Sequence, residues 1–302
     1  PLTNIVAYGL RNPWQMIEHN DSIIIPDVGN QNIEELNVIS YSSFSDGCEI
    51  GINIIGNDGS EKCSFMTPVS HGWPIYEGPF YSKELNKKLD KYHLLSHYFY
   101  KAWNEGNLNR EIIKDYAEQY YQHVKAFPRY ISATHSLCED IEKRKVLLEN
   151  LQDEENKDGD HPRLWRDFAF AMGSSKEEVE SAKEEKFTTE LIENFFKNGR
   201  ASYAEGLASL YTYERQIPEI AETKIRGLKN HYGVTSKEGL KFFEVHKAAD
   251  VYHRQACEKL LDSMSKKEQE KAEKSALSTA KYLWNFLTGM AVKHNIPMQA
   301  VA

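Results

Sequence analysis

The sequence lacks several features that would assign it to particular classes of protein. None of its apolar runs approaches the roughly 20 residues of a transmembrane helix, and no signal peptide is visible. Its 4 cysteines lie far apart without a CxxC pair, so we expect reduced thiols rather than disulfides or a zinc site. A net charge of −8 argues against a nucleic-acid-binding surface. We therefore expect a cytoplasmic protein that binds neither a membrane nor a nucleic acid.

The composition of the 302-residue chain changes near Gly78. Residues 1–78 contain short apolar runs separated by Gly, Asn, Asp and Pro, a pattern typical of β-strands. Residues 79–302 show helical periodicity instead, which predicts an all-α domain, most naturally a bundle. The N-terminal strands are expected at Ser22–Ile25, Leu36–Ile39 and Glu49–Ile55, with a hairpin turn at Asn57–Gly59.

The helical part carries clear start and stop signals. Apolar residues recur every three or four positions from Leu85 to Trp103, which predicts an amphipathic helix. Asn109 is expected to cap a long helix that Pro128 interrupts or kinks. His161 and the following proline fit a first helical turn. Further helices are expected at about 138–151, 161–173, 187–198, 201–214, 218–232, 236–262 and 266–292. One more helix is expected to begin at residue 174.

Three residues with metal-binding side chains share one predicted helix face. His246, Asp250 and His253 are spaced i, i+4 and i+7, which places them on the same side of an α-helix. Two imidazoles and a carboxylate on one face make a plausible half of a metal site. A solvated helix face with two ordinary histidines is the alternative, and this stretch alone does not decide between them.

Other candidate ligands lie elsewhere in the helical part. Glu154 precedes His161 by a short turn, and Glu214 falls in an aromatic segment that is expected to be buried. A buried glutamate without a partner is costly, so we expect a cation or metal nearby. Each residue also has an ordinary explanation: Glu154 as a surface acid, His161 as a helix-start residue and Glu214 as the partner of an arginine. Together with the 246–253 stretch they supply three carboxylates and three imidazoles, a set that favours iron or manganese.

Many segments of residues 82–292 occur in the same order in one known family. They include Phe99–Tyr100, Asp115–Ala117, Tyr120–Tyr121, Lys125–Pro128, Asn150–Asn156, Tyr213–Glu214, Lys224–Leu228 and the 246–253 stretch. These segments resemble the heme-oxygenase-like (TenA/PqqC-like) metal oxidases, and more closely their CADD-type members, named for association with death domains. The resemblance implies a helical bundle with two metal ions, Fe/Fe or Mn/Fe. The implied ligands are Glu154, His161, Glu214, His246, Asp250 and His253.

The resemblance also implies an activity. CADD-type proteins are described as oxygen-dependent synthases of 4-aminobenzoate, a folate precursor, that consume their own side chains. Tyr100 matches the source of the ring and Lys224 the amine donor, with O2 as co-substrate and an external electron donor. Tyr116 and Tyr213 match aromatics that line the family's cavity, whereas Phe242 replaces a tyrosine of the chlamydial protein. Related proteins are often dimers, so we expect a homodimer.

Other functions stay open at this point. A multiple-turnover dimetal oxidase could act on an external small amine or amino-acid-like substrate, and a protein-interaction module would agree with the name of the CADD type. A metal-free, thiaminase-like reaction through a cysteine would leave six candidate ligands without a purpose. Without the resemblance, Tyr100 would be interpreted as a core aromatic and Lys224 as a surface cation.

The N-terminal part resembles a different family. Ala7–Trp14, Ile24–Gly29, Glu34–Ile39 and Gly72–Gly78 are similar to segments of the glucose/sorbosone dehydrogenases, which are β-propellers that use pyrroloquinoline quinone (PQQ). This resemblance implies quinone contacts for Arg11 and Asn12. Because a propeller needs several further blades, we interpret residues 1–78 as a propeller remnant or fusion without dehydrogenase activity, and do not expect PQQ to bind. An irregular β extension with a structural arginine is the alternative.

Overall fold

The chain divides into two compact units, Pro1–Glu77 and Gly78–Ala302, in a computed structural model. The structure describes residues 81–157 and 159–297 and six strands between residues 17 and 64. For the strands, and for residues 248–253 within a long helix, it describes the backbone alone.

The N-terminal unit contains two three-stranded antiparallel sheets. The first has the order β1 (Ile17–His19), β2 (Ser22–Asp27), β3 (Glu35–Ser40), and the second the order β4 (Phe44–Ser45), β6 (Glu61–Ser64), β5 (Asn53–Ile55). The strands expected at 22–25 and 36–39 are present, and the third expected strand is described from Asn53 onward. Arg11, Asn12 and the expected turn at 57–59 lie outside the described residues, so the propeller interpretation stays a prediction.

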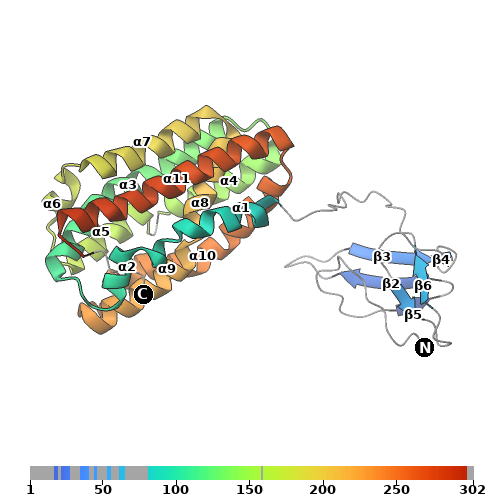
Figure 1. Ribbon diagram of the computed structural model, residues 1–302, viewed down its shortest axis with the longest axis horizontal. Helices are drawn as coiled ribbons and strands as arrows, with labels where there is room; N and C mark the ends of the chain where they lie inside the picture. Colours follow the sequence, from blue (N-terminus) through green and yellow to red (C-terminus); the bar gives the residue numbers. More distant parts are fainter. Residues whose placement is uncertain are drawn as a thin grey trace. The chain divides into compact units, whose positions relative to one another are not determined.

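The second unit is a bundle of helices, several of them long and running side by side (Figure 1). The α-helices are α1 (Tyr81–Leu89), α2 (Tyr98–Asn104), α3 (Arg110–Ser136), α4 (Ile141–Glu154), α5 (His161–Ala171), α6 (Lys176–Ser181), α7 (Lys186–Ala201), α8 (Tyr203–Glu214), α9 (Ile217–His231), α10 (Lys237–Asp262) and α11 (Lys266–Lys293). The predicted all-α class is confirmed. No helix among the described residues has both the length and the apolar composition of a membrane span.

Helix α8 lies inside the bundle. It contacts α3, α7, α10 and α11, and every residue from Gly206 to Glu214 is buried. Its sequence of small and aromatic residues allows this, because an inner helix must be apolar on all sides. The last turn of α8 therefore brings Tyr213 and Glu214 into the interior.

Side-chain caps explain where several helices begin. Asn109 accepts a hydrogen bond from the backbone of Ile112 at the start of α3, as expected from the sequence. Asp140 and Asp160 cap α4 and α5 in the same way. Asp140 sets the start of α4, and Asp160 sets the start of α5 and with it the end of the connection around residues 155–160.

The helix expected from Leu85 to Trp103 is broken in the structure. Two short 3-10 turns, η2 (Asp90–Tyr92) and η3 (Leu94–Ser96), separate α1 from α2. Here the buried Gln216 side chain accepts a hydrogen bond from the Leu94 backbone, and the His97 ring accepts one from the Phe99 backbone to cap α2. These side chains replace helical backbone bonds, so the apolar periodicity continues while the helix does not.

Pro128 does not interrupt α3, which is a single element from Arg110 to Ser136. The proline is buried within the part of α3 that packs between neighbouring helices. Tertiary packing here offsets the loss of one helical hydrogen bond.

Candidate metal centre and adjoining cavity

Three of the predicted metal ligands meet in the structure. Glu154 ends α4, His161 begins α5, and His246 lies in α10. Their potential ligand atoms all lie within 4.8 Å of one another, and all three residues are buried. Glu154 and His161 meet because the chain reverses between α4 and α5, which places His161 Nδ1 2.8 Å from Glu154 Oε2.

The ring of His246 is oriented by its own helix. Its Nδ1 lies 2.7 Å from the carbonyl oxygen of Phe242, one turn earlier in α10. A carbonyl can only accept, so this contact places the proton on Nδ1 and the lone pair on Nε2. Metal-binding histidines are commonly held in this way, by donation of the other ring N–H to a carbonyl or carboxylate.

Glu214 lies deep in the bundle beside this group. It is 2% exposed, and burial raises the pKa of its carboxyl to about 8, with a further upward contribution from Glu154. The Asn150 amide opposes this shift by donating a hydrogen bond of 2.6 Å to Glu214 Oε1. A buried carboxylate of this kind is stabilised when a cation is bound nearby.

The side chains described so far fit a site for divalent metal ions. Carboxylate oxygens and imidazole nitrogens converge in a buried position, and this donor set suits iron and manganese. Proteins of the di-iron carboxylate type hold their metals in the same manner, with ligands from several helices of a bundle. The side chains of Asp250 and His253 lie outside those described, although α10 is helical through both positions.

Tyr100, Tyr116 and Lys224 form a second buried group, contributed by α2, α3 and α9. The two phenol oxygens are 2.8 Å apart, and Lys224 Nζ donates to the Tyr116 hydroxyl at 2.5 Å. The exposed fractions are 2%, 0% and 5%, so Lys224 is not a surface cation.

The environment of Lys224 is almost entirely aromatic. Its Nζ lies between 4.7 and 5.6 Å from six ring centroids, those of Tyr100, Trp103, Tyr116, Tyr120, Trp165 and Phe243. Burial lowers the pKa of Lys224 well below its ordinary value, and no described carboxylate opposes that shift. The neutral amine is favoured, and its lone pair makes it a nucleophile.

Both tyrosines are held as neutral phenols. Burial raises the pKa of Tyr100 and of Tyr116 well above the ordinary value. Neighbouring phenols add to this rise at Tyr116, whereas at Tyr100 the hydrogen bond with Tyr116 opposes it. A phenol in such a site loses its proton only together with an electron or to a strong base, so oxidation would be coupled to proton transfer.

The candidate metal ligands and the tyrosine–lysine group border one cavity. His246, Tyr100, Lys224, Tyr213 and Phe242 all contribute to its wall. The space left between them is about 10 Å³, which admits about one water molecule. The protein's own side chains therefore fill the position next to His246.

Several other wall residues of the cavity were not among the site residues predicted from the sequence. Tyr120, Trp165 and Phe243 line it together with residues from η3 and α9. Tyr120 follows Tyr116 by one helical turn, so the spacing of these two residues was an available signal. Phe243 directly follows Phe242, and helical spacing does not place adjacent residues on one face. Trp165 carries no such signal, because its contact depends on how α5 packs against α3.

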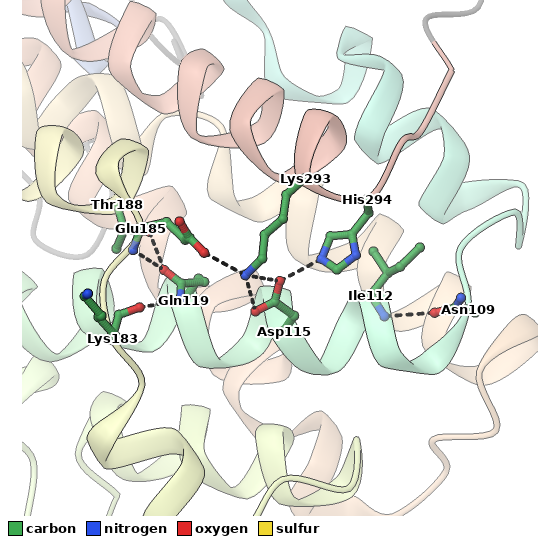
Figure 2. A network of polar contacts seen from close by, with 9 residues as sticks. All are labelled: Asn109, Ile112, Asp115, Gln119, Lys183, Glu185, Thr188, Lys293 and His294. Carbon is green, nitrogen blue, oxygen red and sulfur yellow. Dashed lines mark hydrogen bonds and ion pairs between the residues drawn. The ribbon is translucent and has the colours of Figure 1, made fainter.

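Polar contacts of Asp115 and Gln119, which directly precede Tyr116 and Tyr120 in the sequence, hold α3 in place (Figure 2). Asp115 Oδ2 lies 2.9 Å from Lys293 Nζ and 2.6 Å from His294 Nε2. Gln119 accepts a hydrogen bond of 2.7 Å from the Thr188 hydroxyl. These contacts join α3 to the end of α11 and the start of α7, which fixes the rotation of α3 and the direction of its tyrosines.

Comparison with known proteins identifies the family. A family model described as TENA/THI-4/PQQC matches residues 82–293. The chain belongs to this family. A member from Chlamydia muridarum, named 4-aminobenzoate synthase, is 39% identical over 205 residues, covering 68% of this chain and 87% of that protein.

Solved structures with a similar fold confirm the predicted architecture. A domain with a heme oxygenase-like fold from Shewanella denitrificans has a TM-score of 0.61 at 13% identity, over 71% of this chain and 92% of that one. A CADD-like protein from Nostoc punctiforme has a TM-score of 0.59 at 16% identity, over 70% and 96%. The expectation of a heme-oxygenase-like helical bundle is therefore confirmed.

Proposed function

We propose that this protein is an oxygen-dependent 4-aminobenzoate synthase that takes the aromatic ring from its own Tyr100 and the amino nitrogen from its own Lys224. The observation that carries the proposal is the filled cavity. Tyr100 and Lys224 occupy the space beside the metal-ligand candidate His246, and about 10 Å³ remains free. The name of the relative that is 39% identical supports the same product.

The filled cavity favours an internal over an external substrate. A benzene ring needs far more volume than one water molecule, so an external aromatic compound or amino acid cannot enter without displacing the wall. Tyr100 already supplies a phenol ring there, and the Lys224 amine lies 4.8 Å from the centre of that ring. The ring and the nitrogen of the product are thus close together before any reaction.

The proposed metal centre is Fe/Fe or Mn/Fe. Glu154, His161, Glu214 and His246 would hold the ions together with Asp250 and His253, and the bound ions would supply the activation of O2. An external donor would supply electrons.

The residues of the chain perform the other tasks. Tyr116 shares a hydrogen bond with Tyr100 and lies 2.5 Å from Lys224 Nζ, so its oxygen can receive the proton that Tyr100 loses on oxidation while its own proton passes to the neutral Lys224 amine. The aromatic wall keeps water out and keeps the Lys224 amine neutral. Tyr116 is thereby a proton-handling residue, whereas Tyr100 and Lys224 are consumed.

Isotope labelling tests the proposal directly. Protein made with ring-labelled tyrosine and side-chain-¹⁵N lysine is loaded with Fe(II) or Fe(II) and Mn(II), reduced and exposed to O2. We expect both labels in 4-aminobenzoate, at less than one product per chain, and mass changes in the peptides that contain Tyr100 and Lys224. Tyr100→Phe should abolish the product, whereas Tyr98→Phe, on the same helix outside the cavity wall, should retain it.

Two results would contradict the proposal. One is a normal yield from Tyr100→Phe. The other is unlabelled product at more than one turnover per chain with an added amine, which would support the alternative of a multiple-turnover oxidase.

A further inference from the structure

Asn150 and Cys257 both contact the carboxylate of Glu214, and we propose that they are positioning residues for metal binding. They hold the Glu214 carboxylate in the orientation in which it binds a metal ion. This inference rests on the proposed function in one respect, that Glu214 is a ligand.

Each oxygen of Glu214 has its own donor. The Asn150 amide donates to Oε1 at 2.6 Å, and the Cys257 thiol lies 3.9 Å from Oε2. All three residues are buried, at 4%, 2% and 2% exposed. Two donors on opposite oxygens restrict rotation of the carboxylate, while an ionised carboxylate has lone pairs for about four partners and can still bind a metal.

The donors lie on the helices that carry other ligand candidates. Asn150 is one turn before Glu154 in α4, and Cys257 is one turn after His253 in α10. The spacing of four residues places each donor on the same helix face as its neighbouring ligand position. Glu214, from α8, is thereby joined to both α4 and α10.

The amide nitrogen of Asn150 makes one described hydrogen bond within residues 81–157 and 159–297, and its acceptor is Glu214. Asn150 lies within α4, which runs from Ile141 to Glu154, so it does not cap a helix. The one described polar interaction of its buried amide nitrogen is therefore the contact that orients Glu214.

Asn198 provides a matched control. It is buried to a similar extent, at 6% exposed, and its amide donates to the hydroxyls of Ser209 and Thr279 at 2.9 and 3.2 Å. This polar group joins α7, α8 and α11 and contains none of the proposed metal ligands. Removing the Asn198 amide should affect folding about as much as removing the Asn150 amide does, but it should leave the affinity for the metal unchanged.

The test measures metal binding and structure separately. Full-length Asn150→Ala, Asn150→Asp and Asn198→Ala are titrated with Fe(II) against a competing chelator, and the spectrum of the loaded iron is recorded with circular dichroism of the protein. We expect both Asn150 variants to bind about 10–100-fold more weakly, the range for residues that orient metal ligands, with an altered iron spectrum. Asn198→Ala should bind as the wild type does.

Cys257 provides a second, independent pair of variants. Cys257→Ala removes the donor and should weaken binding, whereas Cys257→Ser keeps a donor and should retain more of the affinity. If Asn150→Ala fails to fold, the positioning role is tested with Asn150→Asp, which keeps the volume of the side chain, and with the two Cys257 variants.

The outcomes separate this inference from the proposed function. If the wild type binds iron and makes product while the folded Asn150 and Cys257 variants keep its affinity and spectrum, the positioning role is wrong and the proposed function stands. If the wild type binds no iron, both are wrong. Equal weakening by Asn198→Ala would show a loss of general stability and would also overturn the positioning role.

Discussion

Lys224 combines a buried position with a single described hydrogen bond, to the Tyr116 hydroxyl. Burial lowers its pKa well below the value in an unfolded chain. The unfolded protein therefore binds one more proton than the folded protein over the pH range between the two pKa values. At neutral pH this difference opposes folding.

Lys224→Met is therefore expected to stabilise the fold while abolishing 4-aminobenzoate formation. Methionine fills a similar volume without an amine, so the gain at pH 7 should be at least about 1 kcal/mol, the free energy of one pKa unit. Because the lysine's unfavourable contribution fades as pH rises toward its ordinary pKa, the gain should shrink between pH 7 and pH 10. Urea unfolding of both proteins at the two pH values measures this, and a gain that is absent or independent of pH would contradict it.

The sequence predicted ligand candidates better than it predicted contacts. His246, Asp250 and His253 stood out because helical spacing is visible in the sequence. The hydrogen bond between Lys224 and Tyr116 joins residues 108 positions apart. Such a contact depends on how α9 packs near α3, and no local pattern contains that information.

The element that carries Tyr100 is short and well delimited. Helix α2 runs only from Tyr98 to Asn104, capped by His97 at its start and followed by Gly106 with a φ of +73°. The His97 ring also lies 3.0 Å from the Thr288 hydroxyl of α11. Burial lowers the pKa of His97 to about 4.

Acid should therefore destabilise the fold partly through His97. Its folded pKa lies below the ordinary value of 6.5, so its contribution to stability is present above pH 6.5 and is lost as the pH falls to about 4. Asparagine is also a good N-cap but does not titrate. We expect His97→Asn to lose less stability than the wild type between pH 7 and pH 4, by roughly 1–3 kcal/mol.

Urea unfolding at these two pH values checks the prediction for His97. The other histidines are common to both proteins, so their effect cancels to a first approximation in the comparison. Equal losses in the two proteins would show that His97 does not contribute.

At the scale of helices, sequence signals located most boundaries but missed the break before α2. Caps such as Asn109 act within a few residues, so they can be recognised locally. The 3-10 turns depend on Gln216, which binds the Leu94 backbone from 122 positions away. The apolar periodicity of 85–103 remained compatible with one continuous helix, and only tertiary contacts distinguish the two cases.

Across the whole bundle, the proposed ligands connect α4, α5, α8 and α10. Metal ions bound there would join these four helices, and binding to the folded state alone raises its stability. At a free metal concentration about 100 times Kd the gain is about 2.7 kcal/mol. For a unit of this size that corresponds to a rise in Tm of roughly 5–10 °C.

Thermal melts with and without Fe(II) or Mn(II) measure this gain. His246→Ala should remove the metal-dependent rise and the bound metal, while its circular dichroism stays that of a helical bundle. A normal metal content in this variant would refute the assignment of His246.

The cavity filled by Tyr100 and Lys224 has a kinetic consequence under the proposed function. Each chain contains its organic substrate in fixed proportion, so the reaction has no KM for a precursor and does not respond to precursor supply. The amount of product would follow the number of chains synthesised, and a spent chain would have to be replaced rather than recharged. Control of this step would then belong to gene expression and protein turnover instead of metabolite concentration.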